Sequence, residues 1–526
     1  MSVFSFDARL LSGLPHVVGI SDLDVRVTAS GTFLYTASEF DGGLGAYQLG
    51  GPTPILIDSM AWGAGTGTLG AADLLLGSAF GRDFLLAAGR FDDRAVVHET
   101  SASGLFVSSV AAPSSSGSEA DWAKSAVATF GGDTFVFAHR RGQPGLEIFR
   151  LNSDLSMTHQ NSSLPPSLAA MQENSALATL QRGETTLLIV ASALDSSVGV
   201  YSVGAGGGLA ERFSMSPGAD LPVNSPVVAE TVTIAGTDYL VLGSHGTSSI
   251  SVFRIEADGQ LTLTDHRIDD LSSRFGGLQA LDILTANGRT LVTAGGADDG
   301  LSLFELSGDG RLHLLASVAD TAERGLQDIS AIAMALIEQD IMVFAAGDEP
   351  GISQLSIAIG NLGPQRLGTE YDDSLLGIAL DDLLVGFGGT DVLDGAAGND
   401  RLVDGEGVDF MIGGSGADVF VFTADRRTDV VLDFEPSVDR LDLSGITGIN
   451  GFSQLEFQDL DVGTLITALG ENIWLPIVGL SSSAFEGSDF IFEQTLRKFA
   501  VSFPSVFGNE LAVHSFPQST GRSSDR

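Results

Sequence analysis

Short apolar segments recur along the first two thirds of the chain at an almost constant interval. They are LYTAS from Leu34, LLAAG from Leu85, VFAHR from Val136, LIVAS from Leu188, LVLGS from Leu240, LVTAG from Leu291 and MVFAA from Met342. Successive segments begin 51 or 52 residues apart. A second strand follows each one and carries a bulky residue at a fixed offset, namely Tyr47, His98, Phe149, Tyr201, Phe253, Phe304 and Leu355. A period held from residue 34 to residue 355 predicts a repeat architecture.

Each repeat predicts four antiparallel strands. An apolar strand precedes each segment, as in residues 126–130 and 331–336, and a fourth strand follows turns such as Asp258-Gly259. Asp-Gly between alternating apolar runs is a strong hairpin signal. Four strands repeated seven times predict an all-β fold with a seven-bladed β-propeller, whose stacked blades supply the core. The seventh repeat lacks a fourth strand after Ile357, and we expect the N-terminal SVFSFDARLL, which resembles the later SVFRIEADGQL, to close the ring.

The amino-acid sequence of the repeats resembles that of one propeller family. The stretch YLVLGSHGTSSISVFRIEADGQLTL at residues 239–263 is similar to the blade of lactonase-like seven-bladed propellers, as is residues 291–314. The resemblance covers roughly residues 1–363. It implies the fold and leaves the activity open, because that superfamily includes lactonases, surface-layer proteins and binding modules.

From Gly368 the period drops to nine. Six units follow without a break to Val421: GTEYDDSLL, GIALDDLLV, GFGGTDVLD, GAAGNDRLV, DGEGVDFMI and GGSGADVFV. The eighth position is always apolar, and the sixth is always aspartate, at Asp373, Asp382, Asp391, Asp400, Asp409 and Asp418. A flexible Gly/Asp linker would not keep an apolar residue at every eighth position. The pattern therefore predicts six residues of turn followed by a three-residue strand whose eighth side chain points inward.

This array resembles the RTX calcium-binding β-roll of secreted bacterial proteins, and its last unit matches the G-G-x-G-x-D-x-U-x pattern of that family. Two units complete one coil, so we expect units n and n+2 to stack. Their sixth-position carboxylates, with backbone carbonyls, would form an all-oxygen shell that suits Ca²⁺. Glycine is needed where the turn takes φ > 0 or the backbone approaches the ion. The predicted metal-site glycines are Gly386, Gly388, Gly389, Gly395, Gly398, Gly405, Gly407, Gly413, Gly414 and Gly416.

The first units depart from the repeat pattern. Tyr371 and Leu380 replace glycine at the fourth position of units one and two, and Asp404 replaces glycine at the first position of unit five. We therefore expect the later calcium sites to be stronger than the first, with about four in total.

The segment after the array resembles the C-terminal module of serralysin-type metalloproteases. The matching stretches are FVFTADRRTDVVLDFEPSVDRLDLSGI at residues 420–446 and SDFIF at 488–492. In that family the module caps the roll and carries an uncleaved signal for type I secretion. The expected domains are the propeller at 1–363, the β-roll at 364–421, a small β-rich cap at 422–492 and a tail at 493–526. The tail is either disordered or carries the signal itself.

Charge and composition limit the classes of partner that this protein can have. The net charge is −41 with 26 basic and 67 acidic residues, which disfavours nucleic acid and suits cations. Cysteine is absent, so neither disulfides nor thiolate metal sites form. No stretch approaches the roughly 18 apolar residues of a membrane span, and the N-terminus has no signal-peptide core. We expect an extracellular protein exported by the type I secretion machinery and bound to Ca²⁺.

Two hypotheses for the propeller remain open. It is a binding or structural module, with a carbohydrate or cell-surface ligand on one face, or it is an extracellular hydrolase of lactone or polysaccharide type with its site in the channel. None of the eight histidines lies in an H-E-x-x-H motif, so proteolysis is not implied. No catalytic residue can be assigned. Polar candidates in the loops are His16, Glu39, Asp41, Arg90, Trp122, Lys124, Arg140, Arg141, His245, Arg274, Arg324 and Asp348. The alternative interpretation is that loop aspartates such as Asp41 form turns and that the arginines balance neighbouring carboxylates.

Overall fold

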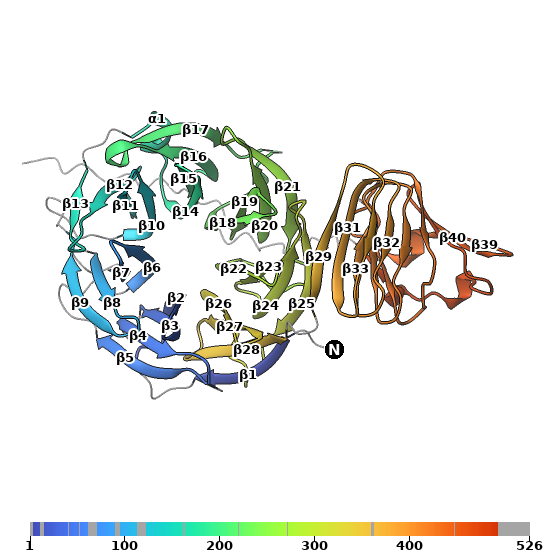
Figure 1. The fold of residues 1–526 in the computed structure, drawn as a ribbon, viewed down its shortest axis with the longest axis horizontal. Helices are drawn as coiled ribbons and strands as arrows, with labels where there is room; N and C mark the ends of the chain where they lie inside the picture. The colour runs from blue at the N-terminus through green and yellow to red at the C-terminus, as the bar shows by residue number, and fades with distance from the viewer. Residues whose placement is uncertain are drawn as a thin grey trace, which may run out of the picture. The chain divides into compact units, whose positions relative to one another are not determined.

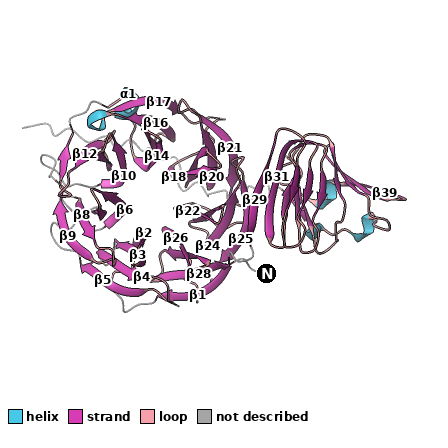
Figure 2. Ribbon diagram, viewed as in Figure 1, coloured by secondary structure: helices cyan, strands magenta, loops and turns pink. Residues whose placement is uncertain are grey.

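The structure is a computed structural model. It describes residues 4–10, 15–39, 42–51, 53–61, 71–89, 95–112, 122–160, 164–218, 220–270, 272–358, 362–446 and 448–492. The regular secondary structure of the described chain is almost entirely β-strand (Figure 2). Its one α-helix is α1 (Pro166–Ala170), and no described helix has the length and apolarity needed to cross a membrane.

Seven four-stranded antiparallel sheets form the blades of a propeller, as predicted (Figure 1). The first six blades each use four consecutive strands, with the first strand innermost. These are β2 (Ile20–Thr28), β3 (Gly31–Ser38), β4 (Gly43–Gln48) and β5 (Ile55–Ala61); β6 (Ala71–Ala79), β7 (Arg82–Gly89), β8 (Val96–Thr100) and β9 (Phe106–Ala111); β10 (Trp122–Phe130), β11 (Asp133–Arg140), β12 (Glu147–Leu151) and β13 (Met157–His159); β14 (Asn174–Arg182), β15 (Thr185–Ser192), β16 (Ser197–Val203) and β17 (Leu209–Met215); β18 (Pro226–Ile234), β19 (Thr237–Ser244), β20 (Ser249–Ile255) and β21 (Leu261–Ile268); β22 (Ala280–Ala286), β23 (Arg289–Gly295), β24 (Gly300–Leu306) and β25 (Leu312–Ala319).

The N-terminal strand closes the ring. The seventh blade has the order β1-β28-β27-β26, in which β1 (Phe4–Leu10) pairs antiparallel with β28 (Ile352–Ala358) and completes β26 (Ala331–Ile337) and β27 (Asp340–Ala346). Phe4 is 5% exposed and packs in a core cluster with Ile357. The predicted closure by the N-terminus is confirmed.

The bulky residue predicted at a fixed offset lies on the third strand counted outward in every blade. It is at most 3% exposed each time, at Tyr47, His98, Phe149, Tyr201, Phe253, Phe304 and Leu355. Core clusters extend from one blade to the next, as where Phe253 of the fifth blade shares a cluster with Ile189 of the fourth. Burial of apolar surface between neighbouring blades is therefore the main source of propeller stability.

Residues 362–442 form a parallel β-solenoid of about four turns, whose two sheets continue into strands of the C-terminal segment. One sheet has the order β29 (Leu362–Thr369), β31 (Asp381–Gly389), β33 (Arg401–Val403), β36 (Val419–Val421), β38 (Arg440–Asp442) and β42 (Phe490–Ile491), with β34 (Glu406–Gly407) beside β31. The other contains β30 (Ser374–Leu376), β32 (Val392–Asp394), β35 (Phe410–Ile412), β37 (Thr428–Val431), β41 (Glu471–Leu475), β40 (Gly463–Ala468) and β39 (Glu456–Leu460).

The pairing register confirms that units n and n+2 stack. Leu384 lies beside Leu402, and Leu402 beside Phe420, in one sheet; Leu393 lies beside Met411 in the other. These eighth-position side chains are fully buried in one core. Most strands cover positions seven to nine, as predicted, whereas β31 begins earlier and continues into the turn of the third unit.

Candidate metal centre

The sixth-position aspartates form two ladders, one on each side of the solenoid. In each step one carboxylate oxygen accepts the backbone N–H of the aspartate one coil earlier: Asp391 from Asp373 at 2.7 Å, Asp400 from Asp382 at 2.7 Å, Asp409 from Asp391 at 2.8 Å and Asp418 from Asp400 at 2.8 Å. The structure thus brings together the four pairs predicted from sequence. The link within a pair is a carboxylate-to-backbone hydrogen bond, which holds each side chain in one orientation.

Among the described residues, the second oxygen of these carboxylates has no hydrogen-bond partner. Oδ2 of Asp391, Asp400, Asp409 and Asp418 is buried and accepts no hydrogen bond, and the same holds for Oδ1 of Asp382. All five residues are at most 1% exposed. A buried carboxylate oxygen left without a donor is strongly unfavourable, and a bound cation removes that cost. The repeated orphan oxygen is therefore the feature that fits a row of hard cations.

Burial changes the acidity of the ladder. Desolvation raises the pKa of Asp400 to about 7 and that of Asp391, Asp409 and Asp418 to about 6, with neighbouring carboxylates adding to the rise. The hydrogen bond from the backbone opposes this shift in each residue. Without a cation, these carboxylates therefore bind protons at a higher pH than an exposed aspartate does, and a divalent ion would compete with protons for the same oxygens.

The predicted glycines act in two ways. At the fourth position Gly389, Gly398, Gly407 and Gly416 have φ between 119° and 148°, and a Cβ on Gly416 would lie 1.6 Å from the carbonyl oxygen of Gly398. At the first position the backbone passes close to the orphan oxygen, since a Cβ on Gly386, Gly395 or Gly413 would lie 2.3–2.4 Å from Oδ2 of the aspartate in its own unit. Gly405 and Gly414, at the second position, also have positive φ. Gly388 has more room, with its nearest contact at 3.2 Å.

The first unit is built differently. Asp373 is half-buried, and its Oδ2 accepts hydrogen bonds from the backbone and hydroxyl of Thr369 at 2.6 and 2.8 Å. Tyr371, in the place of the fourth-position glycine, is 79% exposed. The oxygen that stays free from the third unit onward is thus already occupied here, as it is in the second unit, where Oδ2 of Asp382 accepts the backbone N–H of Ile378 at 2.6 Å. This geometry agrees with a weaker first site.

Two aspartates beyond the array extend the ladders. Asp429 accepts the N–H of Asp409 at 3.0 Å, and Asp439 accepts that of Asp418 at 2.9 Å. The spacing has grown from 18 residues to 20 and 21, so the nine-residue period does not reveal them. Both keep the local pattern of an aspartate two residues before a buried apolar residue, Val431 and Leu441. This local pattern is the signal in the sequence from which both aspartates could have been predicted.

The innermost propeller strands carry a second group of charges. Oxygens of Asp22 and Asp24 on β2, Asp73 on β6 and Asp282 on β22 accept backbone N–H groups of the next blade, at Leu74, Leu76, Ser125 and Met334. Lys124 lies 2.9 Å from Asp73 and 4.0 Å from Asp22. These carboxylates therefore join neighbouring blades, and Lys124 offsets part of their charge.

Three of the remaining loop candidates have polar contacts close by. Arg324 bonds the carbonyl of Ala319, His245 contacts that of Gly277, and Arg140 pairs with Glu147 at 3.6 Å. These are local contacts of the loops. Asp41 and Arg90 lie outside the described residues.

Comparison with known proteins identifies the array. A family model described as the RTX calcium-binding nonapeptide repeat, in four copies, matches residues 367–402 and 385–420. The chain therefore contains RTX calcium-binding repeats next to a seven-bladed propeller. No curated protein sequence matches.

Solved structures resemble parts of the chain. The Dos1 propeller has 13% identity and a TM-score of 0.42, covering 64% of this chain and 78% of its own. A functionally unknown protein from Desulfotomaculum acetoxidans has 14% identity and a TM-score of 0.42, covering 57% and 86%. The AlgE6R3 subunit of the Azotobacter vinelandii mannuronan C5-epimerase has 28% identity and a TM-score of 0.21, covering 30% and 94%.

Proposed function

We propose that this is a secreted protein whose β-roll folds on calcium outside the cell and whose propeller serves as a binding or structural module. The observation that carries the calcium part is the row of buried, unpartnered oxygens on Asp391, Asp400, Asp409 and Asp418. They repeat in register with the stacked coils. Calcium would supply the missing partner and, with it, folding free energy.

The ligands we assign to calcium are the sixth-position carboxylates, together with backbone oxygens of the intervening glycine turns. Twelve acidic residues lie between Glu370 and Asp418, with Arg401 as the only base. Their mutual repulsion opposes compaction when no cation is bound. Low free calcium inside a cell would then keep the roll unfolded for export, and external calcium would fold it.

Hydrogen exchange of the full chain tests this proposal. With millimolar Ca²⁺ in place of EDTA, amides in residues 368–421 should become protected, whereas amides of the inner blade strands should change little. Mg²⁺ at the same concentration is the control, because its smaller, stricter octahedral shell fits this turn poorly. Equal protection of residues 368–421 in EDTA and in Ca²⁺ would refute the calcium-folding part.

Export is a separate part of the proposal. RTX repeats are typical of secreted proteins, and we assign the type I secretion signal to residues 422–492 or the tail that follows. Deleting residues 422–526 should retain the protein inside a host that carries type I machinery, whereas deleting the propeller should not. Export of the chain without residues 422–526 would place the signal elsewhere.

For the propeller, the inter-blade bonds of Asp22, Asp24, Asp73 and Asp282 support a structural role of the axial carboxylates. This favours the binding or structural module over a hydrolase. A carbohydrate or cell-surface ligand is the partner we propose for the propeller face. A glycan array probed with the calcium-loaded protein tests it, and turnover of lactones or polysaccharides would favour the hydrolase instead.

A further inference from the structure

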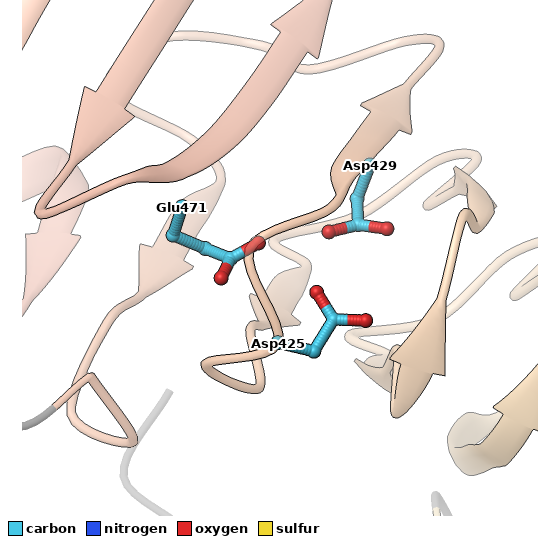
Figure 3. Close-up of side chains that lie close together, drawn as sticks. All are labelled: Asp425, Asp429 and Glu471. Carbon is cyan, nitrogen blue, oxygen red and sulfur yellow. The ribbon is translucent and has the colours of Figure 1, made fainter.

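Outside the nonapeptide array, three carboxylates from separate segments converge on one point (Figure 3). Asp425 lies in the bend after β36, Asp429 is in β37, and Glu471 is the first residue of β41. One carboxylate oxygen of each lies within 4.8 Å of those of the other two. Asp429 and Glu471 are 2% and 1% exposed, and Asp425 is half-buried.

A tight hairpin places Glu471 in this cluster. Leu469 and Gly470 form the two-residue turn between β40 and β41, with φ of 51° and 97°, as a type I′ turn requires. Strand β41 then runs parallel to β37, with Ile473 opposite Asp429. Glu471 thereby reaches the bend, and its Oε2 accepts the backbone N–H of Arg426 at 2.7 Å.

The other oxygen of Glu471 has no hydrogen-bond partner in the part of the chain that the structure describes. Oε1 is buried and accepts no hydrogen bond, and it belongs to the side chain that is aimed into the cluster (Figure 3). Asp425 is oriented by the N–H groups of Gly407 at 2.6 Å and Arg427 at 2.7 Å. Among the described residues no basic side chain forms an ion pair with any of the three carboxylates, and both arginines of the bend are exposed. Three clustered negative charges with an orphan buried oxygen are unfavourable unless a cation is bound.

We propose that Asp425, Asp429 and Glu471 form a further calcium site, separate from the nonapeptide repeats. The donor set is all oxygen, which selects a hard cation over zinc or copper. Ca²⁺ holds its ligand oxygens at about 2.3–2.6 Å, so oxygens of one shell lie up to about 5 Å apart. The spacing within 4.8 Å fits such a shell, with water completing it.

The site ties the β40–β41 hairpin to the end of the repeat array. Asp429 also accepts the N–H of Asp409, so the ion would lie at the point where the repeat ladder passes into the C-terminal strands. Calcium dependence therefore extends past Val421 into residues 422–492. This goes beyond the function proposed above, because all three ligands lie outside the repeats.

The test counts calcium ions in the full-length protein. Native mass spectrometry at a fixed free Ca²⁺ concentration should find one ion fewer in Glu471→Gln and in Asp425→Asn than in the unchanged chain. The glutamine at 471 still offers an oxygen to the N–H of Arg426, so the bend keeps its hydrogen bond. Glu456→Gln, at an exposed position of β39, is the matched control and should keep every ion.

Thermal unfolding separates a metal ligand from a structural carboxylate. In the function proposed above the roll is unfolded without calcium, so its unfolding is followed at a low and at a saturating Ca²⁺ concentration. If Glu471 is a ligand, Glu471→Gln should reduce the rise of the roll's thermal midpoint between the two concentrations. An unchanged ion count, or a midpoint lowered by the same amount at both concentrations, overturns the proposal; Asp425→Asn decides if the first variant does not fold.

A third variant, Asp400→Asn, removes a carboxylate of the repeats and so distinguishes failure of the additional site from failure of the repeat sites. Loss of ions in Asp400→Asn with none lost in Glu471→Gln overturns only the additional site. An unchanged chain that binds no calcium overturns both.

Discussion

Asp400 and Asp418, stacked one coil apart, are joined by a 2.8 Å hydrogen bond from the backbone N–H of Asp400 to Oδ1 of Asp418. Oδ2 of Asp418 is buried beside Gly413 and accepts nothing. One oxygen thus fixes the side chain and the other stays available. In Asp391, Asp400 and Asp409 as well, Oδ1 accepts a hydrogen bond and Oδ2 stays available. The array therefore suits several ions in a row.

The first prediction compares Asp400 with Asp373. Asp400→Ala removes a buried carboxylate that bonds Asp382 and stacks against Asp418. With Ca²⁺ present it should cost about 1–3 kcal/mol of unfolding free energy and lower the number of bound ions. Asp373→Ala, at the exposed end of the ladder, should cost less and lose fewer ions. Calcium titration and denaturant unfolding measure both. Equal losses would show that the ranking of the sites is wrong.

A second prediction concerns the fourth-position glycines. Gly416 has φ of 147°, and a Cβ there would lie 1.6 Å from the carbonyl oxygen of Gly398. Gly416→Ala should destabilise the calcium-bound roll by about 3 kcal/mol, because strain and overlap add. Gly451→Ala is the control, since a Cβ at Gly451 meets nothing within 4 Å. Similar unfolding curves for the two variants would argue against the tight turn.

A third prediction concerns ring closure. Deleting residues 2–10 removes β1 and the buried side chain of Phe4, leaving β28 as an exposed edge. The loss should exceed the roughly 3–5 kcal/mol typical of a buried Phe→Ala change. Deleting residues 493–526 should leave the propeller transition in place. Calorimetry of the two truncated chains decides, and an unchanged propeller transition without β1 would contradict the closure.

A fourth prediction gives the propeller a pH dependence. Burial and neighbouring carboxylates raise the pKa of Glu230 to about 8 and that of Asp24 to about 7. The charged groups that face them are Asp22, Lys124 and Asp282. Because these folded-state pKa values lie above the unfolded ones, the stability they contribute is full at low pH and is lost as pH rises from about 4 to about 8.

Glu230→Gln tests that dependence. The variant should have a higher thermal midpoint than the unchanged protein at about pH 9. The decrease of the midpoint between about pH 5 and pH 9 should therefore be smaller in the variant. Glu338→Gln, at an exposed turn of the seventh blade, should leave the pH profile unchanged. If Glu230→Gln has the pH profile of the unchanged protein, Glu230 does not titrate in this window.

The sequence was sufficient for features that depend on periodicity. The interval of 51 or 52 residues placed Tyr47 and Phe253 at equivalent buried positions, and the nine-residue period placed Leu384 over Leu402. Features that depend on three-dimensional proximity were missed. Asp429 and Glu471 are 42 residues apart in the chain, and only the parallel pairing of β37 with β41 brings them together.

The form of the ladder was also beyond sequence reasoning. Asp373 and Asp391 were expected to meet across an ion, and the structure adds a direct bond from the backbone of one to the carboxylate of the other. Likewise Asp22 and Asp282 were not singled out, because a carboxylate that bonds the next blade has no local signature in the sequence.

The most direct test of the calcium ladder is anomalous diffraction from crystals of the full chain grown with Ca²⁺. We expect peaks in the anomalous difference map within coordination distance, about 2.3–2.6 Å, of Oδ2 of Asp391, Asp400, Asp409 and Asp418. These peaks should vanish in crystals soaked in chelator. A calcium-grown crystal whose roll is folded as described, with no anomalous peak beside any of these four oxygens, would contradict the account.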